Sequence, residues 1–438
     1  MRISSCLALG FVMLPLTVAP SAQGTQAERY WHQWRGPSAN GISRTATPPL
    51  EWSEKQNVRW KVEIPGRGSS SPVIWGDRVF ITTAIPAGSN LADSHRPLGG
   101  VQPRTPHRFV VMALDRRDGR VIWERTAREE APHEASHQDN GTWASPSIVT
   151  DGEHLIASFE SRGLYAYDLN GRLIWEKDLG DKSMRSEFGE GSTPALHRNH
   201  LVVVWDHTKG SFVVALDKRT GNELWRVARN EIDTWATPYI VEHGGRAQVI
   251  VPGMNRMHSY DLETGSVVWH SQGLTMNPIP SPVAEDGIMI AMSGFRGNSL
   301  KAVRLADAKG DITGTSAIVW SLDRDTPYVP SPLLFDGFLY VIKTNSPILS
   351  VFDGKTGKPH YQLQRLEGLS EIFSSPVGAA GRVYITARDG QTMVLRNSPT
   401  FEVLAKNVLD DGFDASPALV DGEIYMRGFR YLYSIGAK

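Results

Sequence analysis

Four histidines lie in one stretch of the chain that also contains a metal-binding pattern. They are His95, His107, His133 and His137. Residues 133–137 read His-Glu-Ala-Ser-His, the HExxH pattern, which on a helix puts two imidazoles on one face to hold Zn²⁺ while the glutamate polarises a bound water. Here Gly141 follows closely, the stretch falls in a connection between strands, and no third ligand can be identified. We therefore expect a polar loop, with a structural or adventitious metal as the alternative and a zinc hydrolase disfavoured.

Positive charges recur at similar places in turns along the chain. The residues are Arg162, Lys209, Arg256, Arg296, Arg388 and Arg430, with Asn345 in a further turn. If these turns meet on one face, the cations form a ring that attracts an anionic ligand, such as a carboxylate-bearing quinone, a phosphate or an acidic peptide. The alternative is that each cation pairs with a carboxylate of a neighbouring loop. Surface pairs of that kind are common and individually weak, which favours the second interpretation.

Acidic and aromatic residues dominate the loops that precede Ser-Pro or Thr-Pro pairs. Those predicted to contact a ligand are Trp143, Glu190, Asp233, Trp235, Glu371 and Asp414. Asp139 and Asn140, close to Trp143, are candidate oxygen ligands for Ca²⁺ over an aromatic floor. Capping of a turn explains the same pair more simply, because Asp and Asn side chains bond to nearby backbone N–H groups. No metal ligand is assigned.

The elements that position these residues belong to an internal repeat. Eight Ser-Pro or Thr-Pro pairs, each followed by a short apolar run, have the prolines Pro72, Pro146, Pro194, Pro238, Pro282, Pro332, Pro376 and Pro417. After a longer first interval the spacing is about 40 to 50 residues, the period of four-stranded propeller blades. Proline suits the first residue of a strand because it has no N–H to donate to the sheet.

Each repeat reads as four strands. Three apolar runs are separated by turn sequences, and a turn containing glycine then precedes a large side chain. We expect an all-β chain folded as an eight-bladed β-propeller of four-stranded antiparallel blades. The large side chain should wedge between neighbouring blades. It is Trp123, Trp175, Trp225, Trp269 and Trp320 in the first five repeats, and Tyr361 and Leu404 in the next two.

The eighth repeat is short by one strand. It contains only the runs 418–420, 424–427 and 431–435. Residues 58–62, with Trp60, have the pattern of the missing outer strand, so we predict that an N-terminal strand closes the ring. Closure also removes exposed sheet edges, which otherwise invite association between chains.

The residues before the ring divide into two segments. Residues 1–24 combine Arg2, an apolar run and small residues, the pattern of a signal peptide, so we expect export to the periplasm or the medium. The apolar run is too short to span a membrane. Cys6 is the only cysteine and precedes that run, so neither a lipid anchor nor a disulfide is expected in the exported chain. Residues 25–57 should wrap along the outside of the ring, and the propeller should occupy residues 58–438.

Net charge and loop length limit the kinds of partner that the chain is expected to have. The formal net charge is −1 and the basic residues are scattered, which argues against nucleic-acid binding. Residues 84–108 interrupt the first repeat and are rich in Gly, Pro, Ser and His, so they are a candidate lid over the mouth of the channel. We expect a monomer.

The Ser-Pro starts, Asp-x-x-x-Gly turns and outer tryptophans of residues 58–438 resemble the repeats of the PQQ (pyrroloquinoline quinone) enzyme-like propeller family. The resemblance implies one of two branches: PQQ-dependent alcohol and sugar dehydrogenases, or non-catalytic propellers such as the lipoprotein of the outer-membrane protein assembly machinery. The dehydrogenases of that family have longer chains, a disulfide of adjacent cysteines, and Ca²⁺ held by Glu, Asn and Asp. This chain lacks the cysteines, and no carboxylate can be matched to a family ligand. It also lacks the lipid-attachment cysteine of the second branch.

The leading hypothesis is therefore an exported module that binds a protein or a small anionic ligand at the channel mouth, without catalysis. The alternative is a short quinoprotein dehydrogenase with PQQ and Ca²⁺ in the channel. The predicted mouth residues are Trp143, Arg162, Glu190, Lys209, Asp233, Trp235, Arg256, Arg296, Glu371, Arg388, Asp414 and Arg430.

Overall fold

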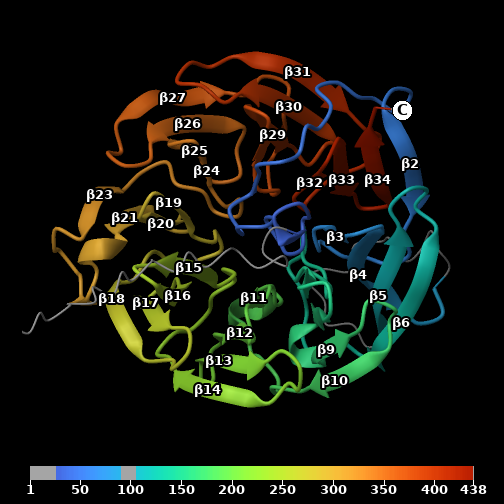
Figure 1. Cartoon of the computed structure of the whole chain (residues 1–438), viewed down its shortest axis with the longest axis horizontal. Coiled ribbons are helices and arrows are strands. Elements are labelled where there is room, and N and C mark those ends of the chain that lie inside the picture. The colour runs from blue at the N-terminus through green and yellow to red at the C-terminus, as the bar shows by residue number, and fades with distance from the viewer. Residues whose placement is uncertain (1–25, 90–104, 438) are drawn as a thin grey trace, which may run out of the picture.

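A computed structural model describes residues 26–89 and 105–437 as a ring of eight four-stranded antiparallel sheets (Figure 1). The prediction of an all-β, eight-bladed β-propeller is confirmed. The predicted signal peptide and His95 lie outside the described residues. No helix among the described residues is long and apolar enough to cross a membrane.

The first four blades follow one another along the chain. The first contains β3 (Val73–Trp75), β4 (Arg78–Pro86), β5 (His107–Asp115) and β6 (Val121–Glu130). The second contains β7 (Val149–Thr150), β8 (Leu155–Ser158), β9 (Leu164–Tyr167) and β10 (Leu173–Lys177). The third contains β11 (Ala195–His197), β12 (His200–Trp205), β13 (Phe212–Asp217) and β14 (Glu223–Ala228). The fourth contains β15 (Tyr239–His243), β16 (Arg246–Val251), β17 (Arg256–Asp261) and β18 (Val267–Gln272).

The remaining blades complete the ring, and the strands of each blade are given in order from the channel outward. The fifth contains β19 (Val283–Glu285), β20 (Ile288–Ser293), β21 (Ser299–Arg304) and β23 (Ile318–Leu322). The sixth contains β24 (Leu333–Phe335), β25 (Phe338–Ile342), β26 (Ile348–Asp353) and β27 (Pro359–Arg365). The seventh contains β28 (Val377–Ala379), β29 (Arg382–Thr386), β30 (Gln391–Arg396) and β31 (Val403–Val408). The eighth contains β32 (Ala418–Val420), β33 (Glu423–Arg427), β34 (Tyr431–Gly436) and β2 (Val58–Glu63).

Short elements decorate these sheets. The strand β22 (Gly310–Asp311) adds to the outside of the fourth blade, and β1 (Ile42–Ser43) adds to the innermost strand of the seventh. Single 3₁₀ turns are η1 (Glu160–Arg162), η2 (Arg185–Glu187) and η3 (Leu305–Asp307). The turn η1 connects β8 to β9 and positions two charged residues at the mouth of the channel.

Outer-strand tryptophans hold neighbouring blades together, as predicted. The Trp175 indole N–H donates to the Lys218 carbonyl oxygen of the next blade at 2.8 Å. Its ring lies against Gly221, which has a φ of +71° and where a Cβ atom would come within 2.8 Å of the ring. Glycine is therefore required at that turn both for its backbone conformation and for the close approach.

The seventh blade departs from this pattern, and the prediction of Leu404 at the outer position is wrong. A bulge in β31 places Ala405 opposite Val394, the position that tryptophan occupies in other blades. Ala405 is smaller than tryptophan, and the segment before β2 fills the remaining space. Leu50 and the buried ring of Trp52 in that segment belong to the same apolar cluster as Ala405. The same register shift occurs in every blade. The sequence offset arises because the chain from Val394 to Ala405 is one residue longer than the equivalent chain from Ala215 to Trp225 in the third blade.

A closed ring of eight hydroxyl groups surrounds the channel. In each blade one backbone N–H donates to the Ser or Thr hydroxyl oxygen of the next blade, at 2.9 to 3.2 Å. The residues in order are Ser71, Ser147, Thr193, Thr237, Ser281, Ser331, Ser375 and Ser416, and Ser416 returns to Ser71. The repeated Ser or Thr thus joins all the blades through their innermost strands.

The second Ser-Pro pair is out of register with the other seven. In the other repeats the ring hydroxyl comes directly before the proline, but in the second blade it belongs to Ser147, directly after Pro146. Ile148 stands where the other repeats have proline, and β7 begins at Val149. An alignment of this repeat by its proline is therefore shifted by two residues relative to the other seven repeats.

The ring closes between its two ends as predicted. The strand β2 pairs antiparallel with β34, with Trp60 opposite Ser434 and Glu63 opposite Tyr431. In Figure 1 the blue β2 lies beside the red β34 at the edge of the ring. The Trp60 indole N–H donates to the Arg116 carbonyl oxygen of the first blade at 2.9 Å, so β2 also docks the eighth blade onto the first.

The segment before β2 follows the outside of the ring only in its later part, where Asn407 of the outermost strand β31 bonds to the backbone of Leu50 and Trp52. Its residues 31–43 cross the face opposite the mouth. There Ile74 N donates to the Trp31 carbonyl oxygen, Thr150 N donates to that of His32, and β1 pairs in parallel with β28. The predicted packing of its tryptophans holds for Trp31 and Trp52, which are buried. The sequence suggested a path along the outside of the ring because the apolar side chains of the segment had to be buried. Packing across the end of the channel buries them as well.

Candidate functional site

The channel opens into a cavity of about 520 Å³, here called the mouth cavity. Loops leading into the innermost strands β3, β11, β15, β19, β24, β28 and β32 build its wall, together with turns between the second and third strands of the sixth and seventh blades. The connection from β6 to β7 completes the wall. Both kinds of loop meet on one face, as the connectivity of a propeller requires.

Five of the predicted contact residues line the mouth cavity. They are Glu190, Trp235, Glu371, Arg388 and Asp414. They are distant in sequence, and loops of different blades bring them together. The cavity therefore presents carboxylates, one guanidinium group and an indole ring to a common space.

Arg388 and Asp414 form an ion pair in this wall. Arg388 Nε lies 3.2 Å from Asp414 Oδ1, and Nη2 lies 3.4 Å from Oδ2. The guanidinium group also lies over the rings of Phe373 and Phe429, 4.8 and 5.6 Å from their centroids. Burial raises the pKa of Asp414 to about 7, while the charges of Arg388 and Arg67 act to lower it. The Asp414 carboxyl can thus hold or release a proton near neutral pH.

Residues 131–142, here called the mouth loop, extend along the cavity from the second blade to the seventh. At one end, Arg162 Nε and Nη2 donate to the Ala131 carbonyl oxygen at 3.0 and 2.9 Å. Toward the other end, Arg388 Nη2 donates to the Asp139 carbonyl oxygen. These contacts hold the loop through its backbone and narrow the opening.

Three glutamates gather at a smaller cavity of about 20 Å³ beneath the mouth loop. Glu160 pairs with Lys182 at 2.7 Å, and both are buried. Glu190 Oε2 accepts the Ser161 N–H at 2.9 Å. Burial raises the pKa of Glu134 to about 8, and the neighbouring carboxylates act in the same direction. Burial also raises the pKa values of Glu160 and Glu190, against the effect of Lys182.

The other predicted contact residues do not line the mouth cavity. They are Trp143, Arg162, Lys209, Asp233, Arg256, Arg296 and Arg430. Trp143 and Arg162 line the smaller cavity beneath the mouth loop, and Trp143 Nε1 donates to the Glu134 carbonyl oxygen at 3.1 Å. Asp233 is buried and pairs with Arg185 at 3.0 Å.

The six turn cations do not form a ring around the cavity, since Arg388 is the one of them that lines it. Arg162 lies 3.2 Å from Asp181, and Arg430 lies 3.6 and 3.8 Å from two carboxylates of the preceding loop. Lys209, Arg256 and Arg296 are exposed. Three of the six thus follow the pairing alternative.

The predicted set of contact residues left out part of the lining. Phe188, Tyr328, Asn345 and Phe373 also line the cavity, and Tyr328 stacks on Phe295 with ring centroids 4.8 Å apart. Tyr328 and Phe373 precede Ser-Pro pairs, just as the selected residues do, so their position was a usable signal. Phe188 offered only its place two residues before Glu190, which does not separate a lining residue from a packing one.

The HExxH stretch is part of the mouth loop and contains no helix. The expectation of a polar loop fits this, because the two imidazoles do not share a helical face. His133 Nδ1 lies 3.5 Å from Asp181 Oδ2. His107 is buried against Trp143, with ring centroids 4.9 Å apart, and its Nδ1 lies 3.0 Å from a backbone carbonyl oxygen.

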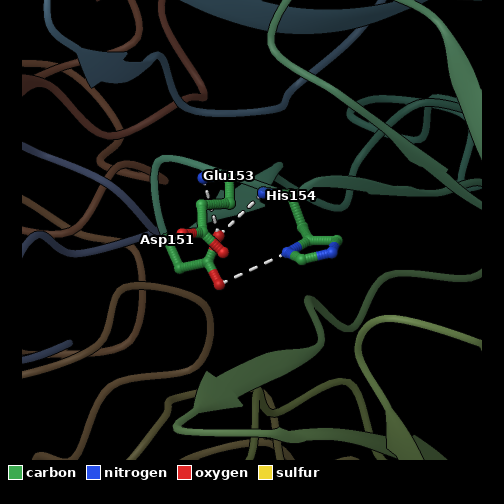
Figure 2. A group of neighbouring side chains, drawn as sticks. All are labelled: Asp151, Glu153 and His154. Carbon is green, nitrogen blue, oxygen red and sulfur yellow. Dashed lines mark hydrogen bonds and ion pairs between the residues drawn. The ribbon is translucent and has the colours of Figure 1, made fainter.

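Within the described residues, one group of three potential metal ligands lies close together, and it is in the turn between β7 and β8 (Figure 2). Asp151 Oδ1 accepts the backbone N–H groups of Glu153 and His154 at 3.0 and 2.8 Å, and Oδ2 lies 3.5 Å from His154 Nδ1. Lys218 Nζ lies 2.5 Å from the same Oδ2. A lysine already supplies the positive charge, so this group is a capped turn on the face opposite the mouth.

Below the mouth cavity the channel is narrow and polar. A space of about 140 Å³ is lined by the hydroxyl ring, Trp235 and Asp414, and Trp34 of the N-terminal segment also lines it. Arg35, next to Trp34, is fully buried, and its Nη2 donates to the carbonyl oxygens of Asn40 and Pro332. The N-terminal segment thus forms a floor at the end of the channel opposite the mouth.

Comparison with known proteins links this fold to two groups. A model of the family described as outer membrane protein assembly factor BamB (PQQ_2) matches residues 51–209, 107–358 and 209–428. Among curated proteins, subunit 1 of methanol dehydrogenase [cytochrome c] from Methylobacterium organophilum is 26% identical over 157 residues, which are 30% of this chain and 24% of that protein. The match therefore spans about a quarter of that relative.

Solved structures show the same fold at low sequence identity. Quinohemoprotein alcohol dehydrogenase from Comamonas testosteroni superposes with a TM-score of 0.66 at 12% identity, over 96% of this chain and 83% of that one. A europium-containing methanol dehydrogenase gives 0.64 at 10% identity, over 91% and 89%. BamB from Moraxella catarrhalis gives 0.58 at 13% identity, over 86% and 98%. The family model matches well over half of the residues of this chain. The chain therefore belongs to the PQQ_2 family of PQQ-like propellers.

Proposed function

We propose that this chain is an exported propeller that binds a small ligand in the mouth cavity. The observation that carries the proposal is the convergence of loops from separate blades on one cavity of about 520 Å³. That volume lies within the usual range for small-molecule sites, about 300 to 1,000 Å³. Aromatic faces line it, as in most such sites, and polar and charged side chains make up more than half of the lining. Export rests on the apolar pattern of residues 1–24.

A small ligand suits this mouth better than a protein surface does. The mouth loop narrows the opening and is tied to Arg162 and Arg388. The groups that could select a partner lie inside the cavity, where a side chain or a small molecule reaches them and a flat protein surface does not. A protein partner remains an outcome that the experiment below can reveal.

The second candidate is oxidation with PQQ and Ca²⁺, and Asp414 is the observation in its favour. A buried carboxyl with its pKa raised to about 7 is suited to proton abstraction. The mouth does not, however, fit a preformed calcium cage. Ca²⁺ requires six to eight oxygen ligands, and in the described chain no three carboxylate or imidazole groups at the mouth lie within 4.8 Å of one another. No catalytic step is therefore assigned.

The test uses a variant that fills the mouth cavity. Gly191 lines it with an ordinary backbone conformation, and an added Cβ would lie 3.6 Å from the Trp235 ring. Gly191→Leu should therefore fold and occupy the ligand space. Gly422→Leu is the matched control, because an added Cβ there meets nothing within 4 Å.

The mature protein, purified from its native host and analysed by native mass spectrometry, should carry a small molecule that Gly191→Leu loses and Gly422→Leu keeps. Thermal-shift measurements with PQQ plus Ca²⁺, followed by dye-linked alcohol oxidation, test the second candidate in the same three proteins. Stabilisation and turnover that disappear in Gly191→Leu would establish the dehydrogenase. A small molecule retained by Gly191→Leu would place binding elsewhere and refute the proposal. A co-purified protein lost in that variant would indicate the protein-binding alternative.

A further inference from the structure

Carboxylates outnumber cations in the wall of the mouth cavity. The acidic lining residues are Asp139, Glu190, Glu371 and Asp414, the basic one is Arg388, and His137 and Tyr328 are the other titratable groups. The Arg388 guanidinium is already paired with Asp414 at 3.2 Å. Three carboxylates therefore remain without a cation within 4.0 Å among the described residues, and their negative potential favours a positively charged ligand.

Glu190 has the strongest need for such a ligand, because it is half-buried whereas Asp139 and Glu371 are exposed. The nearest cations on the protein are engaged elsewhere: Lys182 pairs with Glu160 at 2.7 Å, and Arg162 pairs with Asp181 at 3.2 Å. Both act on Glu190 only through longer-range attraction. A buried charge is costly unless it is paired. A cationic group in the mouth cavity would supply the missing partner.

Aromatic faces lie beside these carboxylates around the ring. Trp235 leads into the blade after that of Glu190, and its Nε1 donates to the Gly189 carbonyl oxygen at 2.8 Å, which fixes the ring. Tyr328 is fixed by its stack on Phe295. Aromatic faces attract cations within about 6 Å of the ring centroid. Arg388, placed over Phe373 in the same wall, shows this arrangement inside the protein.

We infer that the mouth cavity recognises an organic cation, with an alkylated ammonium or similar group near Glu190 and Glu371 and an apolar or planar body against Trp235 and Tyr328. This inference rests on the proposed function and gives it a ligand class. It replaces the anionic ligand suggested by the turn cations, because Arg388 is the one turn cation that reaches the cavity. An anion would instead meet the unpaired carboxylates.

The test compares three probes of similar size and different charge. Benzyltrimethylammonium, benzyl alcohol and benzoate are titrated into the mature protein by calorimetry at constant ionic strength. The cation should bind at least about tenfold more tightly than the other two, which corresponds to about 1.4 kcal/mol. Glu190→Gln should weaken binding of the cation about tenfold, and Trp235→Ala should weaken it further by removing the aromatic face.

Glu371→Gln provides a variant whose folding is secure, because this side chain is exposed. It should weaken cation binding severalfold and leave the weak binding of benzyl alcohol unchanged. Glu367→Gln is the control, since this carboxylate is 74% exposed and does not line the cavity. It should bind the cation as the unaltered protein does.

The outcomes separate this inference from the proposed function. Benzoate or benzyl alcohol binding as tightly as the cation, with loss in Gly191→Leu, would overturn the inference and keep the mouth cavity as a ligand site. Cation binding that is equal in Glu190→Gln, Glu371→Gln and Glu367→Gln would also overturn it. If no probe shows binding that Gly191→Leu removes, both the inference and the proposed function are refuted.

Discussion

The two ends of the channel are closed in different ways. At the floor, residues 31–43 are held mainly through the backbone, with N–H groups of Ile74, Thr150 and Gly378 donating to carbonyl oxygens of the segment. At the mouth, charged and aromatic side chains from separate blades surround a cavity. The floor adds to these backbone contacts the buried side chains of Trp31 and Arg35, whereas the side chains at the mouth border a cavity. The floor thus belongs to the packing of the fold, and the mouth is the end at which the proposed ligand would bind.

The largest expected effect is at the floor. Trp31 is fully buried, so Trp31→Ala should lower the free energy of unfolding by about 3 to 5 kcal/mol through lost burial and the cavity left behind. Trp34 is half-buried at the channel, so Trp34→Ala should cost clearly less. Urea unfolding of both variants measures this. Equal losses would show that the channel side of the floor is as important to the fold as its buried side.

At the mouth, stability should depend on pH through Asp414. Burial raises its pKa from 3.8 to about 7, so between these values the folded state keeps a proton that the unfolded state releases. The free energy of unfolding should therefore fall as pH rises through that window. Asp414→Asn removes this contribution, which amounts to about 1.4 kcal/mol for each unit of pKa difference. Urea unfolding from pH 4 to pH 8 tests it, and parallel curves for the two proteins would contradict the assignment.

The hydroxyl ring between the two ends should give a smaller effect. Ser281→Ala removes the acceptor of the Thr237 N–H at 2.9 Å, and a buried donor without a partner costs about 1 to 3 kcal/mol. Ser281→Thr keeps the hydroxyl that Thr193 and Thr237 supply in other blades, so it should stay near the unaltered stability. Thermal unfolding distinguishes them. A loss in the threonine variant as large as in the alanine variant would mean that shape, and not the hydrogen bond, matters at this position.

The smallest effect is expected at the rim of the mouth. Lys209 is exposed and does not line the cavity, so Lys209→Gln should change stability by less than about 0.5 kcal/mol. It should also leave binding of benzyltrimethylammonium unchanged. Calorimetry and thermal unfolding check both statements. A large change in binding would show that the site extends beyond the cavity and would support a role for the turn cations.

Repetition explains how much of the fold could be predicted. The four strands recur in eight blades, and an outer tryptophan recurs in six of them, so an error in one copy is visible against the others. The failures lie where repetition breaks: Leu404, where the preceding turn is one residue longer, Pro146, where the serine follows the proline, and residues 31–43, which occur once.

The mouth was less predictable because its residues do not repeat. Connectivity placed Glu190, Trp235 and Asp414 on one face, and the structure brings them into one cavity. The same rule also selected Asp233 and Arg256, because position in a loop does not fix the direction of a side chain. Whether an acidic residue faces the cavity or a neighbouring arginine, as Asp233 faces Arg185, depends on packing between blades.

Pairing of β2 with β34 also has a consequence for how the chain reaches its final form. Val58 is opposite Ile435, so the first strand of the ring stays without its partner until almost all the intervening chain has been made. Contacts so distant in sequence slow folding. During that interval the emerging chain exposes an unpaired strand edge that can capture a neighbouring molecule. The strand that completes the ring therefore also sets how long a newly made chain needs protection from aggregation.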